Sequence, residues 1–232
     1  MKRVSLFIFA TLAIAMAGCA EKEQYPNPDG APPINEHFLD DLITAESLNL
    51  TQIESNNGQL SPLLITFEQL TKLSAFEKNT IYEQIGDTTY NRVKTGGDRA
   101  VVNNFTSIDI ISSAQFGQIP AGESLASKVV FYGATIKPYL DSGYTTLGNW
   151  SVWGDYPEDG WFGGNDCYEE WTPIVKNVSE VTRDDLQLLG YRTPTNELHF
   201  TEVPEVKEHT FTVTIVDEGG YVMTASIDYV FE

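Results

Sequence analysis

Basic residues are scarce in this chain. Its 232 residues include 14 Lys and Arg against 33 Asp and Glu, so the formal net charge is −19 at pH 7. A nucleic-acid-binding protein needs a basic surface to neutralise phosphates, and this composition excludes that class. An acidic surface of this strength favours cations or neutral ligands over phosphates.

Cysteine is equally rare, with only Cys19 and Cys167 present. If Cys19 is modified, as argued below, no disulfide can form within the chain, and stability has to come from a hydrophobic core. Cys167 is then either a buried small hydrophobic residue or a free thiol. Burial is the commoner state of an unpaired cysteine.

Motifs of catalysis and metal binding are also lacking. The three histidines, His37, His199 and His209, have no close metal-ligand spacing. His199 and His209 lie in alternating stretches, where we expect the imidazole to face solvent. The chain has no G-x-S-x-G, P-loop or G-x-G-x-x-G pattern. We therefore expect neither an enzyme nor a bound cofactor.

No apolar run reaches the ~20 residues that a bilayer-spanning helix needs. The run from Val4 to Ala15 follows Lys2 and Arg3 and ends in Met16-Ala17-Gly18-Cys19. Its length and order are typical of a cleavable signal peptide over residues 1–18. These residues resemble the lipobox of bacterial lipoproteins. An ordinary secretory signal with a chance cysteine is the alternative.

The lipobox resemblance implies that the Cys19 thiol carries diacylglycerol and that the chain is cut before Cys19 and then acylated. Two or more acyl chains hold a protein stably on a membrane. Cleavage would remove Lys2 and Arg3 and leave a formal net charge of −21. Ala20 stands where enteric lipoproteins of the inner membrane carry Asp. The resemblance therefore implies a lipid anchor in the outer membrane, on its periplasmic or cell-surface face.

Residues 19–34 are expected to form a tether between the lipidated cysteine and the folded part. Pro26, Pro28, Pro32 and Pro33 favour an extended, semi-rigid segment, with a rise of ~3.1 Å per residue. Residues 35–232 are of a length that suits one domain.

Alternation of apolar and polar residues predicts a mainly β fold. Strands are expected at 60–67, 105–112, 128–136 and 172–181, with a C-terminal hairpin whose halves alternate around Asp217–Gly220. Helical spacing suggests short helices within 35–57 and 67–85, and Thr182-x-x-Asp185 is typical of a helix cap. The absence of a βαβ rhythm favours an antiparallel immunoglobulin-like β-sandwich, with one or two short helices in its N-terminal part.

Three of these stretches also carry a second resemblance. Ser107–Ser112, Pro120–Leu125 and Glu208–Ile215 are similar to uncharacterised lipoproteins of gut Bacteroidetes. Those proteins have no assigned activity, so the resemblance implies source and compartment rather than function.

Aromatic residues are concentrated between Pro138 and Trp171, which we call the aromatic segment. It holds all four tryptophans, Trp150, Trp153, Trp161 and Trp171, interleaved with carboxylates and without Lys or Arg. An apolar ring beside carboxylates is what a sugar site needs. The candidate ligand-binding residues are Trp161, Trp153, Tyr156, Asp159 and Asp166.

Two other interpretations of the aromatic segment stay open. The carboxylates could bind Ca²⁺, although their spacing is not that of an EF-hand. The indoles could instead form a small core that holds a long loop together. We expect Trp150 and Trp171, nearest the flanking strands, to be buried and Trp161 to be the most exposed.

The sequence thus leads to two functions from different classes. The first is a membrane-anchored cell-envelope lipoprotein that binds a ligand or glycan without catalysis. The alternative is a structural or accessory subunit of an envelope complex, with a protein partner and no small-molecule site. A third hypothesis is a hydrolase that uses a pair of carboxylates, and no sequence motif supports it.

Overall fold

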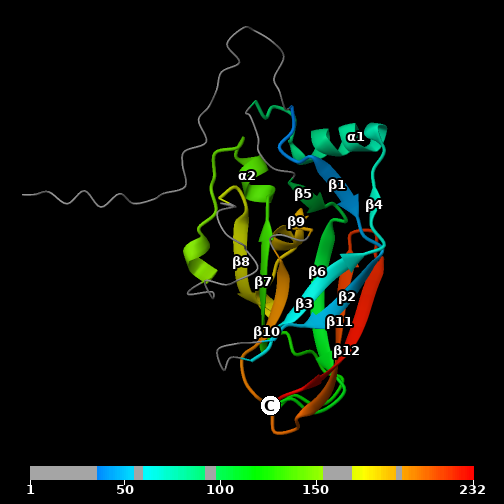
Figure 1. Ribbon diagram of the computed structural model, residues 1–232, viewed down its shortest axis with the longest axis vertical. Coiled ribbons are helices and arrows are strands. Elements are labelled where there is room, and N and C mark those ends of the chain that lie inside the picture. The colour runs from blue at the N-terminus through cyan, green and yellow to red at the C-terminus, as the bar shows by residue number, and fades with distance from the viewer. Residues whose placement is uncertain (1–35, 55–59, 92–97, 154–168, 192–194) are drawn as a thin grey trace, which may run out of the picture.

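Two β-sheets in a sandwich-like arrangement carry two short α-helices at one end (Figure 1). The computed structural model describes residues 36–54, 60–91, 98–153, 169–191 and 195–232. The expected signal peptide, Cys19, the tether and Cys167 lie outside these ranges. In the described part, no helix is long and apolar enough to cross a membrane.

The larger sheet is mixed. Its strands run, in spatial order, β2 (Ser47–Gln52), β3 (Leu63–Glu68), β10 (Asn196–Phe200), β7 (Val129–Thr135), β9 (Leu189–Gly190), β5 (Arg99–Val101), β1 (Asp41–Thr44) and β4 (Thr71–Lys72). β8 (Thr172–Asn177) pairs with β7 alone and forms an edge. β1 and β5 run parallel, and the other recorded pairs are antiparallel.

The smaller sheet follows the order β12 (Val222–Val230), β11 (Glu208–Asp217), β6 (Phe105–Ser112). Alternate residues of β11, including Phe211, Val213 and Ile215, are fully buried, while the threonines between them are half-exposed. They pack on the larger sheet to form the main core, where Phe116 and Phe200 contact Phe211.

A second core lies at the helical end. It joins residues from the start of the domain, from both helices and from the end of the aromatic segment: Phe38, Leu39, Leu42, Tyr82, Tyr90, Tyr139, Tyr144 and Trp171. At its centre the side chain of Asp87 is fully buried. The carboxylate accepts hydrogen bonds from the backbone N–H groups of Phe38 (2.6 Å) and Leu39 (2.9 Å) and from the hydroxyl of Tyr144 (3.0 Å).

Local signals fix the ends of α1 (Ala75–Ile85). Ser74 and Glu77 form a reciprocal capping box at its start, and Gly86 ends it with φ +76°. Glycine suits that left-handed position because it has no Cβ to clash. α2 (Lys137–Asp141) begins with Pro138 in its first turn, a position where proline costs no hydrogen bond.

The mainly β class and the sandwich-like arrangement are confirmed. The hairpin, β6 and β7 appear where alternation predicted them, with Ile227 half-buried against the main core. The immunoglobulin-like topology is not confirmed, because the larger sheet has nine strands and includes a parallel pair.

The helix expected within 35–57 is wrong. That stretch forms β1 and β2, and Leu42 and Ile43 are both buried although successive residues of a strand point to opposite faces. The helix expected from residue 67 begins only at Ala75, since Phe67 belongs to β3. The cap at Thr182 and Asp185 forms, with Asp185 Oδ2 accepting from the Thr182 N–H at 2.8 Å, but it starts a 3-10 helix, Asp184–Leu186.

The second core makes the stability of the protein sensitive to alkaline pH. Burial, reinforced by the Asp87 carboxylate, raises the pKa of Tyr82 and of Tyr144 to about 12. The folded protein keeps phenol protons that the unfolded chain loses near pH 10, so stability falls as the pH rises from 10 to 12. Two pH units at ~1.4 kcal/mol each set an upper limit of about 3 kcal/mol on the loss from each tyrosine.

Urea unfolding at several pH values measures this effect. Tyr82→Phe loses the hydrogen bond to the Leu39 carbonyl (2.8 Å), so it starts less stable at pH 7. Its stability should then decline less steeply above pH 10 than that of the unchanged chain. Parallel pH curves for the two proteins would contradict this account.

Candidate functional site

The described ends of the aromatic segment are firmly fixed. Trp171 is 1% exposed and donates its indole N–H to Asp98 Oδ1 at 3.2 Å. Its expected burial is confirmed. Trp150, which opens a 3-10 helix over Trp150–Trp153, is only half-buried at the rim of the second core, so its expected burial holds in part.

Most candidate ligand residues lie outside the described ranges. These are Tyr156, Asp159, Trp161 and Asp166, and for Trp153 the structure describes the backbone alone. Their convergence on a ligand, and the exposure of Trp161, stay predictions.

Within the aromatic segment, the chain leaves at Gly148 and returns beside it at Glu169. The N–H of Gly148 donates to the carbonyl of Glu169 at 2.6 Å, which brings the departing and returning chain together. A Cβ at this position would lie 1.9 Å from the carbonyl oxygen of Trp171, so no other residue fits. This close approach forms a rigid base for the chain between them.

A groove of about 610 Å³ lies beside that base. Pro173, which faces Gly148, forms part of its lining. The groove runs between α2, the first residues of β8 and the 3-10 helix Asp184–Leu186. Its apolar surface comes from Pro138, Pro173 and Ile174, and its hydroxyl groups come from Thr135, Ser142 and Thr172.

Charged side chains line the groove mostly as ion pairs. Lys137 and Asp141 lie 2.6 Å apart, and Lys176 and Asp185 2.7 Å apart. Burial alone would raise the pKa of Asp185, but hydrogen bonds from Lys176 and Thr182 outweigh it and hold that pKa below its usual value. Asp184 is exposed and makes no side-chain ion pair with any described residue.

The lining of the groove thus combines apolar rings with hydroxyls and ion-paired charges. Proline rings next to hydroxyls and paired charges suit an uncharged, polyhydroxylated molecule. None of the three histidines lines it. Among the described residues, no group of three or more His, Cys, Asp or Glu could hold a metal ion.

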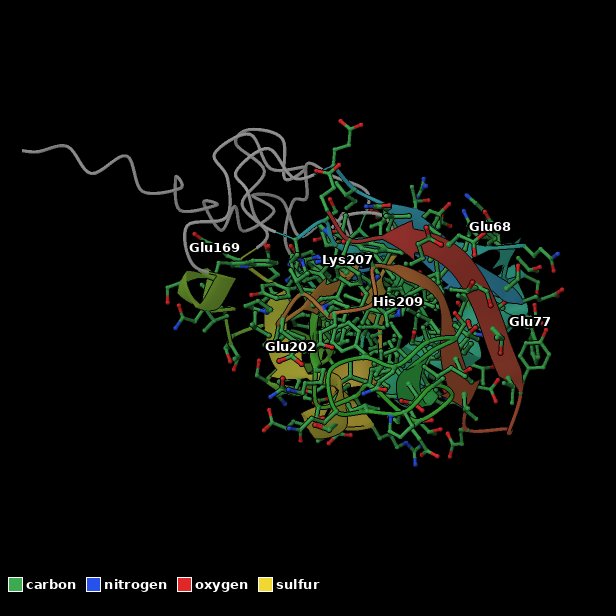
Figure 2. The ribbon with its side chains drawn as sticks, turned by 90° about the horizontal axis from the view of Figure 1, so that it is seen from below. Glu68, Glu77, Glu169, Glu202, Lys207 and His209 are labelled. Atoms are coloured by element: carbon green, nitrogen blue, oxygen red, sulfur yellow. The ribbon has the colours of Figure 1, made fainter. Side chains whose placement is uncertain are left out.

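One histidine is placed differently from the sequence-based expectation. His209 was expected to face solvent, but it is 4% exposed and lies among interior side chains (Figure 2). Its Nδ1 accepts from the Ser112 hydroxyl at 2.6 Å, and its Nε2 donates to the Val206 carbonyl at 2.8 Å. Since Ser112 is also buried, this pair joins β6 to β11 inside the protein.

A second polar cluster, missed by the sequence analysis, surrounds Glu197 on β10. Its carboxylate is 2% exposed, accepts from the Thr195 hydroxyl at 2.8 Å and contacts His199 Nε2 at 2.9 Å. The ring of Tyr132 lies 4.2 Å from that of His199. Burial, followed by the charge of Glu197, raises the pKa of Tyr132. The sequence signal for this cluster was the alternation of Thr195, Glu197 and His199, because every second residue of a strand lies on the same face.

Comparison of the chain with family models, with curated proteins and with solved structures gives no match. Its structure alone therefore defines its class. It is a mainly β, sandwich-like protein with two helices at one end.

Substitution of Gly148 tests the base of the aromatic segment. Gly148→Ala should lower the melting temperature by several degrees and change the near-ultraviolet circular dichroism of the tryptophans, because the methyl group meets the Trp171 backbone. Gly219→Ala is the control, since its added Cβ meets only the Asp217 side chain at 3.3 Å. Equal, small effects of the two substitutions would mean that the base is not closely packed.

Proposed function

We propose that this protein is a lipid-anchored lipoprotein of the outer membrane that binds a glycan without catalysis. The order of charges, apolar core, small residues and Cys19 supports the anchor. The observation that carries the binding function is the groove beside the closed base of the aromatic segment.

The composition of the groove supports a glycan as its ligand. Its volume lies within the ~300–1,000 Å³ of small-molecule sites, and it is open along the surface, which suits part of a longer chain. The rings of Pro138 and Pro173 can meet the C–H face of a sugar, and the exposed carboxylate of Asp184 can accept hydrogen bonds from its hydroxyls. In this proposal Trp153, Tyr156, Trp161, Asp159 and Asp166 extend the surface from the adjoining segment.

The ionisation of Asp185 argues against general-acid catalysis by this carboxyl group. A carboxyl group that serves as general acid needs a raised pKa, so that it still holds a proton near neutral pH. The pKa of Asp185 is lowered instead, and the ammonium group of Lys176, 2.7 Å away, stabilises the ionised carboxylate. The proposal requires no metal, and Ca²⁺ bound by Asp159 and Asp166 is an addition that metal titration would reveal.

The accessory-subunit function remains the second candidate, on one observation. Leu147 and Val152, on either side of the base of the aromatic segment, are 55% and 49% exposed. Exposed apolar side chains that gather on one surface can mark a protein contact. A stable envelope-protein partner, captured only when both are intact, would favour this function.

The anchor is tested at Cys19. When residues 1–18 are exchanged for an ordinary secretory signal peptide and Cys19 is changed to Ala, the chain should leave the detergent phase in Triton X-114 partitioning. The unchanged chain should stay in that phase and show acyl groups on Cys19 by mass spectrometry. A Cys19→Ala chain that still enters the detergent would refute lipid anchoring at this residue.

The groove is tested with the secreted Cys19→Ala chain on a glycan array. Asp184→Ala should weaken binding of the glycans retained by the parent about tenfold, because it removes an exposed acceptor from the lining. Glu123→Ala removes an exposed carboxylate that does not line the groove, and should leave binding unchanged. Equal binding by all three chains would exclude the groove as the site, and binding of no glycan would exclude the function.

A further inference from the structure

A smaller pocket lies on the other side of the Lys137–Asp141 ion pair from the groove. Both hollows share these two residues, and the pocket extends from them toward α1. It encloses about 210 Å³, room for roughly seven water molecules at ~30 Å³ each. That is below the range of drug-sized sites and matches a single small ring.

The inner surface of the pocket is apolar and fixed. Val102 and Leu188 are buried there, and Ile81 and Ile85 of α1 form one wall. Leu188 has φ +51°, a left-handed conformation that is unfavourable for an L-residue with a Cβ. Its carbonyl accepts from the Ile136 N–H at 3.3 Å, which holds the backbone in this conformation.

Amide side chains line the opening. Gln84 and Asn104 are exposed, and their side chains make no hydrogen bond to any other described residue. Asn104 also has a left-handed backbone, with φ +53°. Gln187 donates its Nε2 to the carbonyl of Phe105 at 2.8 Å, which fixes the third amide at the pocket.

The pocket carries almost no net charge. Lys137 and Asp141 neutralise each other at 2.6 Å, and the remaining lining residues are uncharged. An anion or a cation would have to break this pair or remain unpaired, at a cost in desolvation. A ligand with one apolar face and several hydroxyl groups can use the isoleucines and the amides together.

We propose that this pocket binds one neutral pyranose ring. The C–H face of the ring lies on Ile81, Ile85 and Leu188, and its hydroxyls bond Gln84, Asn104 and the exposed side of the Lys137–Asp141 pair. The choice of a sugar rests on the proposed function, while the site is new and uses no residue of the aromatic segment. A terminal sugar in the pocket places the next unit of a glycan at the ion pair, where the groove begins.

The experiment measures binding of single sugars to the secreted Cys19→Ala chain by saturation-transfer NMR. The probes are glucose, galactose, mannose and N-acetylglucosamine, with glucuronate and glucosamine as charged counterparts. At least one neutral sugar should bind, and glucuronate and glucosamine should each bind at least tenfold more weakly than that sugar. No binding of any neutral sugar, or equal binding of the charged ones, would overturn the proposal.

Two adjacent substitutions locate the site. Gln84→Ala should weaken binding of the sugar at least tenfold. Alanine has the highest helix propensity, so this substitution preserves α1. Glu83→Ala, on the same helix but outside the pocket lining, should leave binding unchanged. Binding that ignores Gln84→Ala would refute this pocket.

Asp184→Ala separates this inference from the proposed function. Asp184 lines only the groove, so its loss should leave the single sugar bound while it weakens longer glycans. Glycan binding that depends on Asp184, with no single sugar held at Gln84, refutes the pocket and keeps the groove. A single sugar held at Gln84, with no dependence of any glycan on Asp184, refutes the groove and keeps the pocket.

Discussion

The helical end of this protein depends on one buried carboxylate. An unpaired charge in an apolar core costs several kcal/mol, so Asp87 is tolerated only because three donors converge on it. Two of these donors are the backbone N–H groups of Phe38 and Leu39, just before β1, and the third is Tyr144, after α2. Asp87 itself follows Gly86, the residue that ends α1. One side chain thus holds together the entry of the chain, α1 and the start of the aromatic segment, and the groove and the pocket both lie on this assembly.

Scarce positive charges reinforce the same end. Lys72 and Lys78 contact Asp41 at 2.7 and 2.8 Å, and Arg99 approaches it at 3.5 Å. Hydrogen bonds from the two lysines lower the pKa of Asp41. These contacts join β1 to β4, β5 and α1 around one acidic residue. Exposed pairs of this kind contribute little singly, but several cations around one half-buried carboxylate fix its neighbours in place. The sequence as a whole keeps a formal net charge of −19, so most carboxylates have no lysine or arginine to pair with.

Local patterns were predictable from the sequence, and long-range arrangements were not. The hairpin, β6 and β7 need only an alternation that adjacent residues display. The same alternation puts His209 on the face of Phe211, so its burial could have been inferred from its position rather than from its polarity. β1 was missed because it has apolar residues on both sides, a pattern that a helix shares. The groove and the pocket arise from segments as distant as Ile81 and Leu188, which no local pattern relates.

The contact between Gly148 and Glu169 separates the chain that connects them from the two sheets. Because the chain leaves and returns at one point, we expect that a change of chain length between Trp153 and Glu169 leaves the pairing of β7 with β8 intact. The entropy of closing a loop rises only slowly with its length, so such changes cost little stability. Gly148 and Trp171 are the positions where the altered segment must match. Any binding function of that segment can thus change while the two sheets stay as they are.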